Sequence, residues 1–534
     1  MRAVWQHQFR SSSRKRFERW RDCLETPCIN NHGFLDFGAQ DRENPRAWSS
    51  SRKWLVTLAT SLLSMNATLA SSFTSSNTLS ISNDFGVSET VAGLSTTVFL
   101  LGFAVGSFIF APLAESFGRR PIHFVTYAAY LGFSVLCALA PNFAALLAGR
   151  FFSSVTIAAS MSNSPGILAD LWEDTDRGNP MAVYSAAAWM GPSIGPVIGG
   201  FIEIKHGWQW AMYVLLCINA LTTIAMVSIP ETCGPVILKK RAKALRAARP
   251  AQYSELQSEL EANSQSLLAM YKEALIRPWA LLFDLINFFC AVYMGVVFTL
   301  QFMLLSIYPI VFQTMRGWNE GVGQLPLLGA VAGAIAAALL IVWDTMRRNR
   351  KHKTHTTLEP EDRLLVSIIG GVGFPIALFW FAWTANYISI HWMVPTIAGA
   401  VLSCAMMLIF VSWTNYIVDS YGCYATSAAA ANLSIRSMSS ASAPLFTESM
   451  FKALGVARGA SLIGGVATLL AVIPILLYKH GQKVRAKSKY ARGRGGKEEK
   501  QDVDQGSPEC QPSASVEKDQ VVRVHHQEPA KLHA

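Results

Sequence analysis

The stretch Gly191-Pro192-Ser193-Ile194-Gly195-Pro196-Val197-Ile198-Gly199-Gly200 decides the fold. Gly191, Gly195 and Gly199 are spaced by four, so on a helix they form one groove in which a neighbouring backbone can approach closely. The two prolines each remove a backbone donor and bend the helix, and an unpaired carbonyl in lipid is costly. We therefore interpret the stretch as an internal membrane span, packed against protein and able to hinge, rather than as a glycine-rich loop.

The composition is that of a polytopic membrane protein. Of the 534 residues, 51% are hydrophobic and 15% are charged, and the apolar residues come in long runs. Runs long enough to cross a bilayer begin near Trp54, Val91, Ile122, Phe143, Met181, Ala211, Leu281, Gly321, Leu364, Trp392, Tyr421 and Ser461. We predict an all-α integral membrane protein with about twelve transmembrane helices.

The charge distribution sets the predicted orientation. The net charge is +11, but Lys and Arg lie in tails and alternate loops, as cytoplasmic anchors do, which argues against nucleic-acid binding. Arg119 and Arg120 follow the second span and a basic run, residues 239–249, follows the sixth. Both termini are therefore predicted to be cytoplasmic. The nine cysteines show no paired spacing for zinc or a disulfide framework and read as small packing residues, so we expect no metal and no cofactor.

Polar segments divide the chain into five predicted parts. They are a cytoplasmic N-terminal tail (1–53), a six-helix bundle (54–230), a cytoplasmic central loop (231–277), a second six-helix bundle (278–480) and a disordered cytoplasmic C-terminal tail (481–534). A faint internal repeat supports two halves, because Glu115 precedes Arg119 by four and Asp344 precedes Arg348 by four. Six spans in each half is the layout of carriers that rock two bundles around a central site.

Several motifs resemble a known family. Residues 111–121, Ala-Pro-Leu-Ala-Glu-Ser-Phe-Gly-Arg-Arg-Pro, resemble the loop between helices 2 and 3 of the major facilitator superfamily, and Gly191–Gly200 resembles its antiporter motif. Further matches resemble the fungal twelve-span drug:proton antiporters, a group of polyamine and multidrug exporters. They include Asp41-Arg42-Glu43-Asn44-Pro45, Leu168-Ala169-Asp170-Leu171-Trp172 and Pro230-Glu231-Thr232-Cys233. The resemblance implies the major facilitator fold, two pseudo-symmetric bundles of six helices.

The resemblance also implies a gate. Glu115, Gly118, Arg119 and Arg120 would form the gating motif between the second and third helices and contact Asp419, near the start of the eleventh span. Such a contact would latch the two halves while the carrier faces outward. Positive-inside anchoring explains Arg119 and Arg120 equally well.

Three charged residues are candidates for proton coupling. Arg150 lies in the fourth span and Arg436 in the eleventh, and an arginine inside a span by default faces a partner or a water-filled cavity. A snorkelling Arg150 or a carbonyl-bonded Arg436 is the structural alternative. Asp284, in the first turn of the seventh span, is the first candidate for the proton carrier; a carboxylate that favours a helix start is the alternative.

A substrate cavity needs aromatic and amide groups from several spans. We single out Trp189, Asn287, Tyr293, Gln301 and Asn415, because aromatic rings hold organic cations and amides hydrogen-bond polar groups. Ordinary packing and hydrogen bonding between helices explains each of them as well.

Together these features predict a proton-coupled antiporter that exports small organic solutes: a drug, a polyamine, a toxin or a secondary metabolite. The expected partners are a small-molecule substrate, protons and the lipid bilayer, in a monomer. We expect the plasma membrane, with the vacuolar membrane as the alternative. An enzyme does not fit, because no nucleophile, base and orienting group are placed together. An uptake carrier, proton-coupled or facilitative, and a non-transporting membrane sensor remain the alternatives.

Overall fold

The computed structural model describes residues 28–30, 33–38, 41–173, 176–248, 250–262, 267–353, 360–421 and 425–488. The predictions for most of the N-terminal tail and for the C-terminal tail beyond residue 488 concern residues outside this set. The described residues fall into two compact units. One draws on Met1–Ala47 and Gly234–Ser264, and the other comprises Trp48–Cys233 and Gln265–Glu499.

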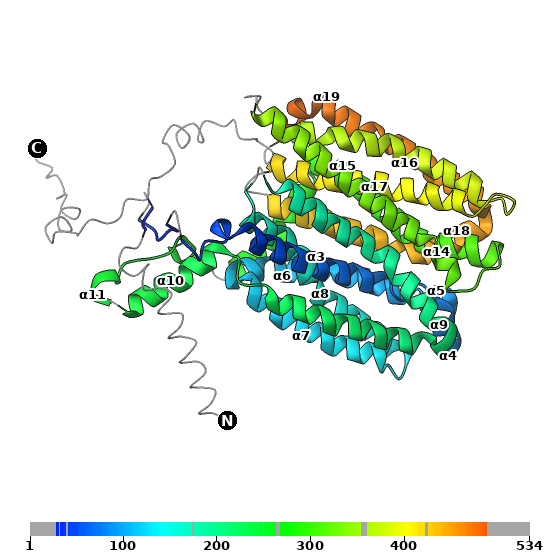
Figure 1. Cartoon of the computed structure of the whole chain (residues 1–534), viewed down its shortest axis with the longest axis horizontal. Coiled ribbons are helices and arrows are strands. Elements are labelled where there is room, and N and C mark those ends of the chain that lie inside the picture. Colours follow the sequence, from blue (N-terminus) through cyan, green and yellow to red (C-terminus); the bar gives the residue numbers. More distant parts are fainter. Residues whose placement is uncertain are drawn as a thin grey trace, which may run out of the picture. The chain divides into compact units, whose positions relative to one another are not determined.

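The first half of the larger unit is a run of antiparallel helices (Figure 1). In chain order they are α3 (Ser50–Ser72), α4 (Thr78–Phe85), α5 (Glu89–Ala92), α6 (Leu94–Phe117), α7 (Arg119–Ala138), α8 (Phe143–Leu171) and α9 (Gly178–Ser228). Within α9, Gly207 has φ 77° and ψ 178°, a conformation that is open to glycine and breaks the helix. α9 therefore contains two membrane helices.

The second half repeats this pattern. It comprises α13 (Leu267–Leu282), α14 (Leu285–Tyr308), η2 (Pro309–Met315), η3 (Val322–Gln324), α15 (Leu327–Lys353), η4 (Pro360–Arg363), α16 (Leu364–Ala385), α17 (Met393–Tyr421), α18 (Ala425–Leu470) and α19 (Val472–Lys487). Gly455, with φ 75°, breaks α18 as Gly207 breaks α9. Within the described residues ten stretches are long and apolar enough to cross a membrane, and two of them contain such a break. They form twelve membrane helices, which confirms the predicted all-α fold.

Small residues bring the backbones together at matching places in the two halves. A Cβ on Gly106 of α6 would lie 2.1 Å from the carbonyl oxygen of Val155 on α8. In the second half, a Cβ on Gly333 of α15 would lie 2.0 Å from the carbonyl oxygen of Ala400 on α17. A glycine four residues earlier, Gly102 or Gly329, makes the same kind of contact. Both are small-xxx-small interfaces, in which two glycines four residues apart let the helix backbones approach closely.

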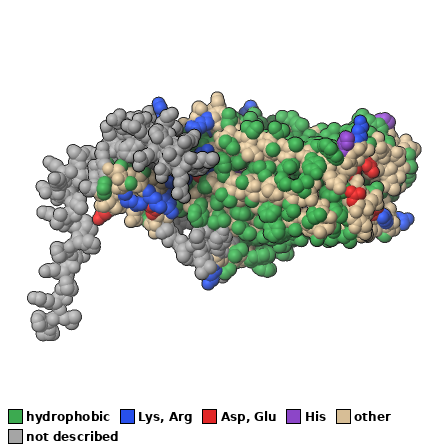
Figure 2. Space-filling model, turned by 90° about the horizontal axis from the view of Figure 1, so that it is seen from below, with side chains coloured by type: hydrophobic (Ala, Val, Ile, Leu, Met, Phe, Trp, Pro, Cys, Tyr) green, Lys and Arg blue, Asp and Glu red, His purple; other side chains and the backbone are tan. Residues whose placement is uncertain are grey.

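The outer surface of the bundle is apolar. Figure 2 shows hydrophobic side chains along its length and charged side chains gathered toward its ends. Leu221, Ile224 and Leu469 are 66%, 70% and 75% exposed, respectively. Apolar side chains that face outward over this length fit a lipid environment, so the unit is an integral membrane domain.

The smaller unit has a core of its own. Its helices are α10 (Gly234–Ala248), α11 (Pro250–Tyr253) and α12 (Glu259–Ala262), preceded in the chain by η1 (Pro45–Ala47). Asp41 and Arg241 form a buried ion pair, and the Leu35 amide donates to the Gln257 carbonyl at 3.1 Å. The residues just before the first membrane helix thus pack on the central loop. The prediction that the cysteines are small packing residues outside any disulfide is wrong for Cys28, which is disulfide-bonded.

Candidate functional site

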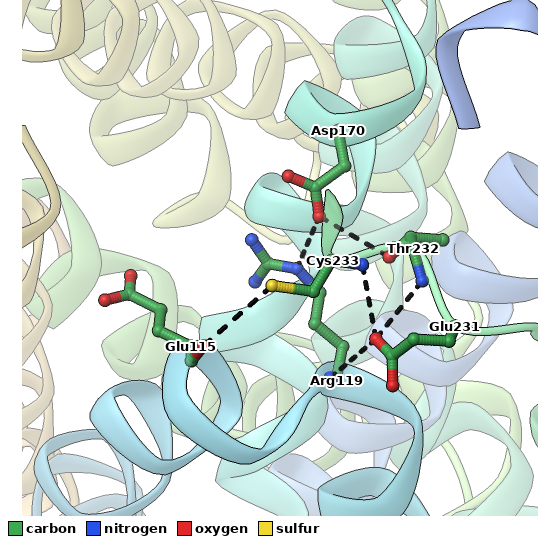
Figure 3. Close-up of polar contacts among 6 residues, drawn as sticks. All are labelled: Glu115, Arg119, Asp170, Glu231, Thr232 and Cys233. Atoms are coloured by element: carbon green, nitrogen blue, oxygen red, sulfur yellow. Dashed lines mark hydrogen bonds and ion pairs between the residues drawn. The ribbon is translucent and has the colours of Figure 1, made fainter. Parts of the chain in front are cut away.

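The predicted gating motif begins a helix. Gly118 has φ 102°, a conformation that L side chains rarely adopt, and it turns the chain from α6 into α7. Arg119 is the first residue of α7, and its Nε donates to Asp170 Oδ2 at 2.7 Å (Figure 3). Its backbone N–H donates to Glu231 Oε1 at 3.0 Å. Arg119 therefore ties α7 both to the end of α8 and to the segment that follows α9.

That following segment is organised around Glu231. The amides of Thr232 and Cys233 both donate to Glu231 Oε1 at 3.2 Å, and the Thr232 hydroxyl reaches Asp170 Oδ2 at 3.5 Å. The Glu231 carboxylate thus accepts hydrogen bonds from three backbone N–H groups, those of Arg119, Thr232 and Cys233 (Figure 3). The sequence alone assigned no role to Pro230-Glu231-Thr232-Cys233, although a conspicuous polar motif directly after a span indicates a contact at the helix ends.

The α8 backbone makes room for the guanidinium. A Cβ at Gly166 would lie 2.3 Å from Arg119 Nη1 and 2.5 Å from Nη2. Even an alanine at residue 166 would displace the guanidinium. Arg120, next in the chain, is exposed. Its guanidinium lies over the ring of Phe124, one turn further along α7, with Cζ 5.5 Å from the ring centroid.

The second half carries an equivalent ion pair, in which Asp419 lies on α17, the tenth membrane helix, and not near the start of the eleventh span as predicted. Arg363, the residue before α16, pairs with Asp419 near the end of α17. α16 and α17 correspond to α7 and α8, so Arg363–Asp419 is the counterpart of Arg119–Asp170. The expected contact of Asp419 with the gating motif is not made in this conformation, because Asp419 is engaged within its own half.

The predicted repeat at Asp344 is a genuine local contact. Asp344 accepts from Arg348 Nε at 2.9 Å and from Arg347 Nη2 at 2.7 Å on the last turns of α15. Glu115 has the same spacing to Arg119, yet the described contact of Glu115 is through its carbonyl, 3.9 Å from Cys233 Sγ. The two halves are therefore alike in their helix-to-helix ion pairs more than in this i, i+4 spacing.

We predict that Asp170→Asn lowers transport several-fold. The charged hydrogen bond to Arg119 is lost, and such bonds contribute about 1.5–3 kcal/mol. Asp419→Asn is expected to have a similar effect, since it breaks the equivalent pair. Transport at matched surface expression is the measurement, with Glu173→Gln as the control at an exposed carboxylate nearby. Unchanged transport in Asp170→Asn would contradict the role of this pair.

Arg150 does not snorkel. Its side chain is buried, at 2% exposure, and Nη1 donates to the Ala70 carbonyl at 2.9 Å. Longer contacts reach the carbonyls of Ser71 and Ser95, at 3.4 Å, and the hydroxyl of Thr74, at 3.2 Å. The carbonyls of Ala70 and Ser71 belong to the last turn of α3, where the helix dipole is negative. Arg150 therefore joins α3, α6 and α8.

Arg436 has a different environment. Its Cζ lies 4.5 Å from the ring centroid of Phe298 and 5.1 Å from that of Phe410. Trp189 completes the group, with ring centroids 5.3 Å from Phe298 and 5.6 Å from Phe410. We call Trp189, Phe298, Phe410 and Arg436 the aromatic box. Trp189 comes from the first half and the other three from the second, so the box lies between the halves.

A hydrogen bond crosses the halves beside the box. Trp189 Nε1 donates to Ser403 Oγ at 3.2 Å, and the Ser403 hydroxyl donates to the Ala330 carbonyl at 2.9 Å. Of the predicted cavity residues, Trp189 is thus hydrogen-bonded to the opposite half.

The other predicted cavity residues lie within the second half. The Asn287 amide donates to the Leu281 carbonyl at 3.1 Å and accepts from Asn432, and Tyr293 packs edge-on to Trp413 at 5.6 Å. These are packing contacts of α14 with its neighbours. Gln301 is buried and its Oε1 has no partner among the described residues. Asn415 is half-buried on α17.

Asp284 lies at the end of the bundle that the sequence predicts to be cytoplasmic. It is the N-cap residue of α14, but its side chain does not cap the helix. It accepts from the Tyr421 hydroxyl and, at 2.7 Å, from Ser488 Oγ. A cavity of about 260 Å³ adjoins it, lined also by Leu285, Lys483, Val484 and Ser488. The carboxylate is thus hydrogen-bonded beside a cavity at the start of α14.

The glycine groove of α9 holds α3. A Cβ on Gly191 would lie 2.1 Å from Thr68 Oγ1, and one on Gly195 2.8 Å from the Leu69 carbonyl oxygen. One on Gly199 would lie 2.5 Å from Ser76 Oγ. Pro192 and Pro196 are both buried inside the helix. Gly200 faces the second half instead, with the Glu320 carbonyl oxygen 2.8 Å from its Cβ position.

Twelve membrane helices in two matching halves, with a polar and aromatic group between them, define a membrane transporter built for movement between halves. The profile described as "Major Facilitator Superfamily" matches residues 56–444, and the chain belongs to that superfamily. It is a transporter and not an enzyme, and the resemblance seen in its motifs is confirmed.

Fungal proteins are among its relatives. "Efflux pump FUB11" of Gibberella moniliformis is 37% identical over 462 residues, which cover 86% of this chain and 77% of the relative. "Major facilitator superfamily multidrug transporter mdrA" of Aspergillus fumigatus is 38% identical over 454 residues, 84% and 74% of the two chains. A solved proton:xylose symporter, XylE, shares the fold at TM-score 0.57 and 17% identity, over 81% of this chain and 96% of its own.

Proposed function

We propose that the protein is a proton-coupled antiporter that exports small organic solutes by alternating access. The names of its relatives, an efflux pump and a multidrug transporter, support export. We further propose that it is a monomer in the plasma membrane with cytoplasmic termini, and the Lys and Arg residues of the tails and alternate loops support this orientation.

The single observation that carries the proposal is how the halves are held. The ion pairs Arg119–Asp170 and Arg363–Asp419 each lie within one half, so each half is braced separately. Away from the aromatic box, the contacts between the halves include small residues. At one end of the bundle the Thr97 hydroxyl donates to the Ala441 carbonyl at 2.9 Å.

At the opposite end a glycine again makes the contact between halves. A Cβ on Gly178 of α9 would lie 2.3 Å from Thr345 Cγ2 on α15. Close contacts of this kind separate without exposing a buried charge. The halves therefore rock as two braced units, which is the movement that alternating access requires.

Proton coupling has a physical carrier in Asp284. It is the carboxylate beside the cavity at the predicted cytoplasmic end, where a released proton reaches water. Arg150 has no reacting proton in this scheme and acts as a positioning residue that joins α3, α6 and α8. An inward proton supplies about 2.3 kcal/mol per 100 mV of membrane potential.

Efflux from loaded cells tests the proposal. Cells that express the chain are loaded with a panel of labelled polyamines, lipophilic cations and organic acids, and loss is followed with and without a protonophore. We expect faster loss of at least one compound, abolished by the protonophore. Asp284→Asn should retain binding but lose the protonophore-sensitive part. Accumulation of a compound against its gradient would instead indicate an uptake carrier.

A further inference from the structure

The four residues of the aromatic box share one depth in the membrane. Counted from the predicted cytoplasmic helix ends Gly178, Leu285, Tyr421 and Ala425, they lie 11, 13, 11 and 11 positions along α9, α14, α17 and α18. At 1.5 Å per residue this is about 17–20 Å, close to the middle of a hydrocarbon core of about 30 Å. The box is a midplane site between the halves.

Arg436 brings to this site a charge with no acceptor. Among the residues that the structure describes, its contacts are the two ring faces of Phe298 and Phe410, and no carboxylate or carbonyl accepts from its guanidinium. Arg150, the other arginine within a span, has acceptors on three sides. Five donors in a fixed fork are therefore free at Arg436.

The helices around the box do not supply a counter-charge. α14 has no acidic residue at all. On α9, α17 and α18 the acidic residues nearest to the box along the chain are Glu203, Asp419 and Glu448. They lie 14, 9 and 12 positions from the box residue of the same helix. Even 9 positions is about 14 Å. The phenol of Tyr184 interacts with the charge of Arg436, but its hydroxyl already donates to the Met161 carbonyl at 3.3 Å.

An unpaired guanidinium at the membrane midplane is costly, and residues of this kind mark substrate paths. Guanidinium matches a carboxylate by two parallel N–H···O bonds, and the adjoining rings offer flat apolar faces. We infer that the aromatic box is the cargo subsite for an organic anion, a carboxylate carried on an apolar or aromatic body. This rests on the proposed function and names its substrate class.

The same geometry disfavours organic cations at this site. The faces of Phe298 and Phe410 are already occupied by the Arg436 cation, so a second cation meets like charge there. The rings touch one another and Trp189 bonds to Ser403, so cargo enters when the halves separate and competes with that bond.

Charge isosteres provide the sharpest probe. 4-Phenylbutyrate, 4-phenylbutanol and 4-phenylbutylamine have nearly the same body and carry a negative, a neutral and a positive head. Binding is measured on the purified full chain in detergent, as the shift in melting temperature with each compound. We expect 4-phenylbutyrate to stabilise the wild type most. Arg436→Gln should lose this shift, with at least a tenfold weaker apparent affinity, while Arg458→Gln, which removes an exposed arginine, should keep it.

Arg436→Lys guards against a folding failure, because it keeps the charge but loses the two-pronged geometry. It should bind 4-phenylbutyrate more weakly than wild type and more tightly than Arg436→Gln. A larger shift with the amine than with the acid in the wild type would overturn the inference. So would equal shifts with the acid in wild type and Arg436→Gln. The shift in melting temperature needs no proton gradient. Efflux that is insensitive to a protonophore would therefore contradict the antiport mechanism without contradicting the anion subsite.

Discussion

Arg150→Ala is expected to abolish efflux and to lower thermal stability. The guanidinium donates to carbonyls on α3 and α6 from a buried position on α8, and truncation leaves these carbonyls without their donor. Each buried acceptor that is left unsatisfied costs about 1–3 kcal/mol. The melting temperature in detergent and efflux at matched surface expression are the two measurements.

Two variants sharpen this test. Arg150→Lys keeps the charge, but a single ammonium does not reach both the Ala70 and the Ser95 carbonyls, so we expect an intermediate stability. Arg458→Ala removes an exposed arginine and should melt like the wild type. If Arg150→Ala also melts and transports like the wild type, Arg150 does not hold the three helices together.

Gly191→Ala is expected to have the second large effect. The added Cβ would lie 2.1 Å from Thr68 Oγ1 and 2.7 Å from both the Leu69 nitrogen and the Met65 oxygen. The hydroxyl can rotate away, but the two backbone atoms move only if α3 and α9 separate. Overpacking of this kind costs about 1–3 kcal/mol, and we expect transport to fall at least tenfold, because α9 is the helix that carries Trp189.

The control is a glycine of the same bundle with free space around it. Nothing lies within 4 Å of a Cβ on Gly132 of α7, so Gly132→Ala should express and transport normally. Removing the Thr68 hydroxyl in Thr68→Val should not rescue Gly191→Ala, since the backbone contacts remain. Rescue by that second change would show that the hydroxyl alone sets the spacing.

The sequence was sufficient for the architecture. The apolar runs predict the helices, and the glycine spacing in Gly191–Gly199 predicts a close approach, which the structure places against α3. Both signals are local: a bilayer demands about 20 apolar residues per helix, and a helix repeats every 3.6 residues. The motif of residues 111–121 resembles that of the superfamily, and the structure shows that its Gly118 and Arg119 form the turn into α7.

Partner choice was decided by the tertiary structure. Asp419 pairs with Arg363 rather than with the gating motif, because α16 and α17 pack within one half. The surroundings of Arg150 and Arg436 also differ, because both lie over ring faces but, within the described residues, only Arg150 donates to carbonyls as well. Hydropathy and spacing assign each residue to a helix and a face, but which groups meet depends on which helices pack together. Only the packed helices therefore show that Arg436 has free donors between the two halves.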